Sequence, residues 1–328
     1  VHEFGHDLGL PDLYTTTGDE DVTWWDLMSV GARTGRLNGS DPTHIGAWGK
    51  TVLGWLDPVV VTPGADAATV LLGQLAQPPE GSTTAVRVDV PPSYERQVPL
   101  VPDSTRLWWS GNDQASADHR LTRELDLTGV TGAVSMSFQL NHGLERDRDF
   151  FFLEVSTDGG ATFVQTKGFR VGTGQERTTA DDYADPNRSL AGYGGLKYGY
   201  TGDNQGWMDV YHDLTPFAGM SIQLRLRYAT SPNNQSRGVF VDNFAVRSGG
   251  AELLVDAVEP AAPSAWTSTP GTFQSATAVD AGWTMTDGTK PIARYYLLEW
   301  RNPVGFDIGL KYAYNTIFAR LTADGARE

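Results

Sequence analysis

Apolar residues recur at helical spacing in one short stretch of the chain and at strand spacing in most of the remainder. In residues 41–57 they follow the intervals of one helix face, which predicts a helix capped by Asp41. Residues 134–140 alternate as V-S-M-S-F-Q-L, the pattern of a strand with one buried face. Residues 150–155 are mostly apolar, which predicts a buried strand, and residues 239–246 predict a further strand.

Changes in this pattern divide the chain into four regions. Residues 1–60 carry the helical pattern, residues 61–103 short apolar runs between Pro and Gly turns, and residues 104–248 a full set of strands. Residues 249–328 begin with a Pro-, Ala- and Ser-rich connection and contain the strong strand pattern Y-Y-L-L-E-W-R-N. We therefore expect a multidomain α+β protein: a helical segment, a small connecting β region, an antiparallel β-sandwich and a partial third β module.

The composition narrows the classes of partner. The 328 residues include 25 Lys and Arg against 40 Asp and Glu, and the net charge of −15 argues against a nucleic-acid backbone. The acidic balance fits a secreted bacterial protein, or acidic side chains gathered for calcium. The sequence has no cysteine, which excludes thiolate zinc ligands, disulfides and a cysteine nucleophile. No apolar run is long enough to span a membrane.

The residues with the clearest chemistry lie in the first twelve positions, V-H-E-F-G-H-D-L-G-L-P-D. On a helix, His2 and His6 are one turn apart on one face, so both imidazoles can reach one zinc ion at about 2.0–2.1 Å. Glu3 lies beside the first ligand, where its carboxylate can accept a proton from the attacking water. Gly9 allows the left-handed backbone that ends the helix, and Asp12 is then placed to be a third, oxygen ligand. The alternative is a helix end with two surface histidines, but this motif is rare by chance.

A second motif supports the zinc site. Residues 24–31 have the sequence W-W-D-L-M-S-V-G, a tight turn that carries Met28 a short distance after the third ligand. This turn resembles the Met-turn of the metzincin zinc peptidases, in which the methionine forms an apolar floor under the metal. The alternative is ordinary core packing of Met28, which is compatible with a Met-turn because that turn is itself a packing device.

Longer segments resemble the immune inhibitor A family of secreted bacterial metallopeptidases: H-E-F-G-H-D-L-G-L-P-D-L-Y, W-W-D-L-M-S-V-G and D-P-T-H-I-G-A-W-G-K-T-V-L-G-W-L. The strand G-V-F-V-D-N-F-A-V resembles the MAM-like jelly-roll module of that family, and Y-Y-L-L-E-W-R-N its C-terminal β module. The resemblance implies that His2, His6 and Asp12 hold zinc, with Glu3 as general base. It also implies that residues 1–60 are the C-terminal part of a peptidase domain. We therefore expect an N-terminally truncated fragment.

Calcium is a second candidate metal. Asp242 and Asn243 interrupt an otherwise apolar strand, and a buried carboxylate needs a partner or a metal. In jelly-roll modules of this kind such an acid often binds a structural calcium ion, here with help from Asn112 and Asp113. A plain hydrogen-bonded turn explains the same residues equally well.

Three further groups of polar residues have two interpretations each. The acidic residues 19–21 could line a cation site, but a solvated loop is favoured. His44 could be a hydrogen-bond donor in the cleft, but a packing or capping role is favoured. Glu299 and Arg301 share a strand face, which predicts an ion pair or a contact with the peptidase segment.

The favoured function is a secreted, extracellular zinc endopeptidase that acts on proteins or peptides, with Glu3 as general base and no covalent intermediate. The second hypothesis is a non-catalytic carbohydrate- or protein-binding remnant in which the β-sandwich acts. It is supported by Trp108 and Trp109, whose rings could stack on a sugar, although such rings are more often part of a core. A third hypothesis is a metal-dependent hydrolase of non-peptide bonds.

Overall fold

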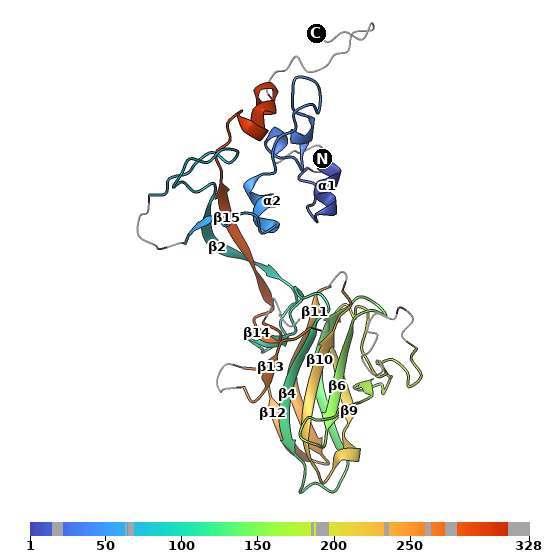
Figure 1. Ribbon diagram of the computed structural model, residues 1–328. Helices are drawn as coiled ribbons and strands as arrows, with labels where there is room; N and C mark the ends of the chain where they lie inside the picture. Colours follow the sequence, from blue (N-terminus) through green and yellow to red (C-terminus); the bar gives the residue numbers. More distant parts are fainter. Residues whose placement is uncertain are drawn as a thin grey trace. The chain divides into compact units, whose positions relative to one another are not determined.

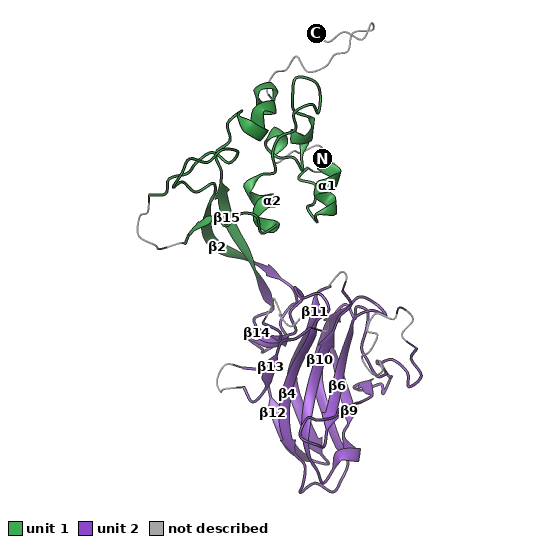
Figure 2. Ribbon diagram, in the orientation of Figure 1, with its two compact units in different colours: residues 1–93, 291–328 green, residues 94–290 purple. Residues whose placement is uncertain are grey.

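The computed structural model describes residues 1–14, 22–62, 64, 69–184, 187, 197–232, 236–259, 264–272 and 281–313 (Figure 1). The chain forms two compact units (Figure 2). Val1–Ser93 and Pro291–Glu328 make up the first, which contains the H-E-x-x-H motif and is referred to as the motif unit. Tyr94–Lys290 make up the second, the sandwich unit.

The motif unit is built from short helices and a small sheet. Its helical elements are α1 (His2–Asp7), η1 (Thr23–Trp25), η2 (Val30–Arg33), α2 (Ala47–Val52) and η4 (Gly305–Tyr312). In its sheet, β2 (Val86–Arg96) lies between β1 (Val59–Val61), to which it is parallel, and β15 (Thr289–Leu298). No helix in the described part of the chain has the length and apolar character needed to cross a membrane.

The helix predicted to start at Asp41 begins later, with α2. Its N-cap is Gly46, whose φ of −70° and ψ of 173° are extended. The N–H of Thr43 donates to the backbone carbonyl of Gly31, and the N–H of Gly46 donates to the buried carboxylate of Asp26. Both hydrogen bonds have a length of 2.8 Å. Residues 41–46 remain outside the helix because these long-range hydrogen bonds outweigh the helical preference that the spacing of the apolar residues indicates.

The sandwich unit consists of two antiparallel sheets, as the sequence predicts. The first has the order β13 (Thr267–Thr269), β4 (Asp118–Asp126), β10 (Ser221–Ala229), β6 (Phe150–Ser156) and β7 (Val164–Gln165). The second has the order β14 (Thr284–Thr286), β3 (Leu107–Trp109), β11 (Gly238–Ser248), β5 (Val134–Gly143), β9 (Met208–Asp213) and β8 (Gly168–Arg170). In addition, β12 (Ala251–Asp256) pairs with β11, and the short helix η3 (Thr215–Phe217) follows β9.

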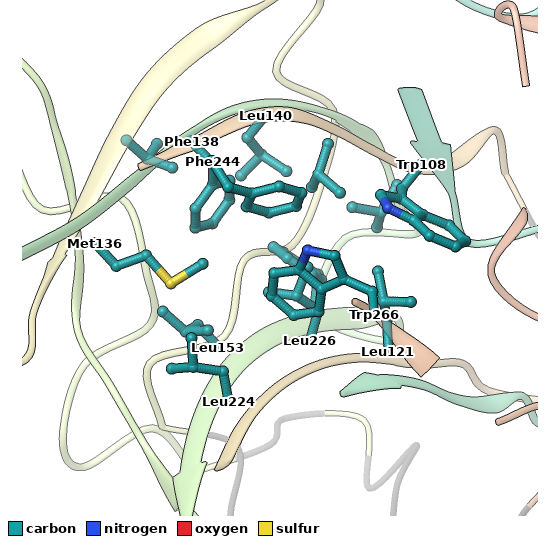
Figure 3. Close-up of a cluster of buried hydrophobic side chains, with 14 of the residues drawn as sticks. Trp108, Leu121, Met136, Phe138, Leu140, Leu153, Leu224, Leu226, Phe244 and Trp266 are labelled. Atoms are coloured by element: carbon teal, nitrogen blue, oxygen red, sulfur yellow. The ribbon is translucent and has the colours of Figure 1, made fainter. Parts of the chain in front are cut away.

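Apolar side chains from both sheets meet in one core (Figure 3). Phe138 of β5 and Phe151 of β6 are buried, and their rings meet edge to face with centroids 6.3 Å apart. The ring of Phe244 from β11 lies 4.8 Å from that of Trp266. Alternate residues of the first part of β5 are buried, and every residue of β6 is buried, so both strand patterns predicted from the sequence are observed.

Strand pairing bears on the third module expected at residues 249–328. The strands β12, β13 and β14 pair with β11, β4 and β3 of the sandwich, whereas most of β15 belongs to the motif unit. The sequence could not show this, because a short strand carries no mark of the sheet edge that it joins. The domain boundaries at residues 60, 103 and 248 stay predictions.

Candidate metal site

Helix α1 presents two imidazoles on one face, and the chain after it brings a carboxylate to them. Nε2 of His2 lies 3.0 Å, and Nε2 of His6 lies 3.4 Å, from Oδ1 of Asp12. Possible ligand atoms of the three residues all lie within 4.8 Å of one another, and no other such group of His, Asp and Glu occurs among the described residues. Two imidazoles and one carboxylate fit the ligands of a catalytic zinc ion, which leaves its fourth position open.

Backbone carbonyls orient both imidazoles. Nδ1 of His2 donates to the carbonyl of Leu27, and Nδ1 of His6 donates to the carbonyl of Leu10, each at 2.8 Å. A proton on Nδ1 leaves the lone pair on Nε2, which is the nitrogen that faces Asp12 in both rings. Metal-binding histidines typically have such a partner on the second nitrogen, because it fixes the tautomer and the ring orientation.

The end of α1 brings the third predicted ligand back to the helix. Gly9 has a φ of +93°, the left-handed conformation expected for it, and its N–H donates to the carbonyl of His6 at 2.8 Å. The N–H of Leu10 donates to the carbonyl of Gly5 at 3.0 Å. The chain therefore turns directly after the helix, and Asp12 returns to the face that carries the imidazoles.

Met28 packs against α1. Its side chain is fully buried, and a Cβ added to Gly5 would lie 2.3 Å from its Sδ. Gly5 lies between the two histidines in the sequence of α1, so the thioether contacts the helix that carries them. The carbonyl of Met28 accepts the N–H of Leu13 at 2.8 Å, and the preceding carbonyl, of Leu27, holds His2. This turn thus contacts the predicted ligand His2 directly. It also contacts Gly5 and Leu13, which are the sequence neighbours of the other two predicted ligands.

Asp26 links the turn that carries Met28 to α2. Its buried carboxylate accepts the N–H of Met28 at 2.7 Å through Oδ1 and the N–H of Gly46 at 2.8 Å through Oδ2. Burial raises the pKa of this carboxyl, while the two N–H donors and the Arg301 guanidinium oppose the rise. A Cβ on Gly46 would lie 2.5 Å from Oδ2, so this close approach requires glycine. An acid that starts a tight turn is a sequence signal for the local hydrogen bond, here to the N–H of Met28, but not for the distant one to Gly46.

The segment after β15 joins the same network. Arg301 is 4% exposed, and its guanidinium pairs with Glu299 at 3.2 Å and with Asp307 at 2.6 Å. Glu299 accepts the N–H of Ala47, the first residue of α2, at 2.6 Å, and Arg301 donates to the carbonyl of His44 at 3.0 Å. The structure therefore contains both the predicted ion pair and the predicted contact with the peptidase segment.

A cleft of about 280 Å³ lies beside the predicted ligands. Its lining includes His2, Glu3, Tyr14, Ser29 and Arg33. The ring of Tyr14 stacks on that of His2 with centroids 6.2 Å apart, and a hydrogen bond between its hydroxyl and Asp12 raises the pKa of the phenol. The sequence offers one signal for Tyr14, its position two residues after the third predicted ligand. Ser29 and Arg33 carry no signal beyond their position after the Met28 turn.

His44 lies in a different environment from the cleft residues. Its ring stacks on that of Phe306 with centroids 5.7 Å apart. Burial and the nearby Lys50 ammonium lower its pKa to about 4, so the imidazole is neutral at pH 7. This geometry agrees with the favoured packing role. The acidic residues 19–21 lie outside the described residues.

The predicted calcium ligands have other partners in the structure. Nζ of Lys290 lies 3.0 Å from Oδ1 of Asn112 and 2.5 Å from Oδ1 of Asp113, so an ammonium group stands next to both. Asp242 is fully buried and accepts the N–H of Asn243 at 2.7 Å, which matches the hydrogen-bonded turn considered above. Burial raises the pKa of Asp242 to about 6. A calcium site at these residues stays a prediction.

Known proteins match the chain in both of its units. Residues 1–55 match the immune inhibitor A peptidase M6 catalytic domain, and residues 74–277 match the immune inhibitor A-like MAM domain. The pre-pro-metalloprotease PrtV of Vibrio cholerae serotype O1 is 28% identical over 320 residues, which cover 94% of this chain and 31% of the relative. Immune inhibitor A of Bacillus thuringiensis subsp. alesti is 27% identical over 347 residues, which cover 99% of this chain and 44% of the relative.

These matches confirm the family resemblance found in the sequence. The chain spans less than half the length of either relative, since 31% and 44% of those proteins are covered. The MAM match accounts for more than half of the chain, and the catalytic-domain match contains all the predicted zinc ligands. The chain therefore belongs to the immune inhibitor A-like family of M6 metalloproteases, and it carries the C-terminal end of a catalytic domain followed by a MAM domain.

Proposed function

We propose that this chain provides the zinc-binding part of a secreted, extracellular endopeptidase that cleaves proteins or peptides. The observation that carries the proposal is the convergence of His2, His6 and Asp12 within the segment that matches the M6 catalytic domain. When bound there, zinc lowers the pKa of a water molecule and polarises the scissile carbonyl. The Vibrio relative is a pre-pro-metalloprotease, which supports export and activation of such an enzyme.

Glu3 is the proposed general base. It follows His2 on α1, and both residues line the same cleft. Its carboxylate would accept a proton from the attacking water and then pass it to the leaving amine. Because the nucleophile is water and not a side chain, no covalent intermediate is needed. Tyr14 holds Asp12 through its hydroxyl, and the carbonyls of Leu27 and Leu10 hold His2 and His6, so the protein orients all three predicted ligands.

A Glu3→Gln variant of the chain tests this assignment. Because glutamine cannot accept the proton, we expect cleavage of fluorogenic peptides and casein to fall by about 10²–10⁴-fold, with zinc content by atomic absorption unchanged. Asp7→Asn, an exposed substitution on the same helix, is the matched control and should leave both quantities unchanged. Loss of zinc from Glu3→Gln would show that Glu3 is a ligand. A wild-type chain that binds zinc but cleaves no peptide would refute endopeptidase activity for this chain.

The carbohydrate-binding alternative loses its main support. Trp108 and Trp109 are 6% and 7% exposed. The ring of Trp109 stacks on Phe240 with centroids 5.9 Å apart, and its Nε1 donates to the carbonyl of Arg237 at 2.9 Å. These two rings are packed within the sandwich unit and are not available to a sugar, so we propose no second function.

A further inference from the structure

The cleft beside the predicted ligands contains a cation that the proposed reaction does not use. Arg33 is the last residue of η2, is exposed and lines the cleft together with Glu3 and Tyr14. No hydrogen bond or ion pair engages its guanidinium among the described residues. Although the chain has a net charge of −15, this guanidinium has no acidic partner within the described residues.

A second polar group in the same cleft also lacks a partner. Ser29 is 2% exposed, and its Oγ has no hydrogen-bond partner in the part of the chain that the structure describes. A buried hydroxyl without a partner is unfavourable and indicates a position that a ligand can satisfy. Ser29 directly follows Met28, and its N–H donates to the carbonyl of Asp26 at 3.1 Å, so the hydroxyl has a fixed position relative to the predicted ligands.

We propose that Arg33 and Ser29 form a subsite for an acidic side chain of the substrate, Asp or Glu, next to the scissile bond. This inference rests on the proposed peptidase function. A guanidinium binds a carboxylate through two parallel charge-assisted hydrogen bonds, and the Ser29 hydroxyl can donate a third. Both residues lie on the backbone segment that leads from the Met28 turn through η2, which fixes the subsite beside the reacting groups.

The charges of the cleft predict an order of preference among substrates. A basic side chain would be repelled by Arg33, a neutral amide would lose the ionic part of the interaction, and a carboxylate would gain it. The Glu3 carboxylate lies in the same cleft and repels an acid, so the acidic side chain must occupy the Arg33 side. Because the chain as a whole is acidic, a preference for an acidic residue over its neutral isostere requires a local cation, and Arg33 is the one arginine or lysine among the described residues that line the cleft.

Two readouts test the subsite in the zinc-loaded full chain. The first is the Kd of peptidyl hydroxamates that differ only in a Glu or Gln next to the zinc-binding group, which requires no turnover. The second is kcat/KM for fluorogenic peptides that differ by Glu or Gln at each position flanking the cleaved bond. We expect the Glu compounds to be favoured by roughly 10- to 100-fold, the factor that a charge-assisted hydrogen bond supplies.

Variants assign the preference to the two residues. Arg33→Gln should abolish it, Arg33→Glu should transfer it to Lys-containing compounds, and Ser29→Ala should reduce it severalfold. Arg33→Lys should retain only part of it, because an ammonium cannot form the bidentate pair. Arg36→Gln, a nearby exposed arginine that does not line the cleft, is the matched control and should keep the full preference.

The outcomes separate this inference from the proposed function. Equal binding of Glu and Gln hydroxamates, or a preference that survives Arg33→Gln, would overturn the subsite even if peptides are cleaved. An Arg33-dependent preference for the Glu hydroxamate without any turnover would support the subsite and refute peptidase activity for the chain. Failure of the chain to bind zinc, measured separately, would refute the proposed function, and with it the subsite.

Discussion

Different kinds of contact stabilise the sandwich unit and the motif unit internally. In the sandwich, the strands are already joined by backbone hydrogen bonds, and a buried ion pair reinforces them. Arg225 of β10 and Glu154 of β6 are directly paired across these strands, and their side chains approach to 2.6 Å. In the motif unit, buried and half-buried polar side chains are themselves the links, because Asp26, Glu299 and Arg301 join backbone segments that share no sheet. Apolar substitutions should therefore act mainly on stability in the sandwich, whereas polar substitutions should act on geometry in the motif unit.

The largest expected effect is a test of the sandwich core. Phe151→Ala removes a fully buried ring that contacts Phe138, and we expect the free energy of unfolding of the sandwich unit to fall by about 3–5 kcal/mol. Urea unfolding, monitored by hydrogen exchange of peptides from each unit, measures this change. The zinc affinity of the motif unit should stay unchanged. Val164→Ala, at an exposed position of β7, is the control. A large drop in zinc affinity with Phe151→Ala would refute the separation of roles.

The corresponding test of the motif unit removes its buried cation. Arg301→Met leaves the buried carboxylate of Asp307 and the half-buried carboxylate of Glu299 without their partner, which should cost about 3 kcal/mol. We expect faster hydrogen exchange in α2 and weaker zinc binding, both measured on the full chain. Arg294→Met, at an exposed position of β15, is the matched control and should change neither. If Arg301→Met leaves zinc affinity unchanged, the network does not position the metal site.

A smaller effect tests a buried acid of the sandwich. Burial raises the pKa of Asp149 to about 6 from an ordinary value of 3.8, while its carboxylate accepts the N–H of Ser231 at 2.9 Å. Because the folded state favours the protonated form, this group stabilises the fold below pH 4, and that stability is lost as the pH rises through about 6. Between about pH 4 and pH 7 the loss should be about 2 kcal/mol, and Asp149→Asn should remove this part of the pH dependence. If Asp149 titrates normally, the unfolding midpoints of the wild type and of Asp149→Asn would change with pH in the same way between pH 4 and 7.

The two units also differ in how much of them the sequence predicts. His2, His6 and Asp12 could be predicted because their geometry is local: a helical turn and a glycine-ended return place them together. The alternation of β5 and the apolar run of β6 likewise depend on local periodicity. These predictions needed no knowledge of distant contacts.

The contacts that the sequence did not predict depend on distant partners. The N–H of Gly46 bonds to Asp26, twenty residues away in the sequence, and this moves the start of α2 from Asp41 to Ala47. Lys290 reaches Asn112 across 178 positions, which no local pattern indicates. The sequence did suggest that Glu299 and Arg301 act together, since residues two apart share a strand face. Their partners in α2 and before it were visible only in the structure.

The contact between Gly5 and Met28 also has a consequence for how the motif is written. The notation H-E-x-x-H treats residues 4 and 5 as interchangeable, but Phe4 is 62% exposed, whereas any side chain at position 5 would overlap the methionine sulfur. A mutant library at Phe4 should accordingly recover many amino acids and one at Gly5 almost none. In searches for related enzymes, H-E-x-G-H followed by a methionine turn would be the more discriminating query.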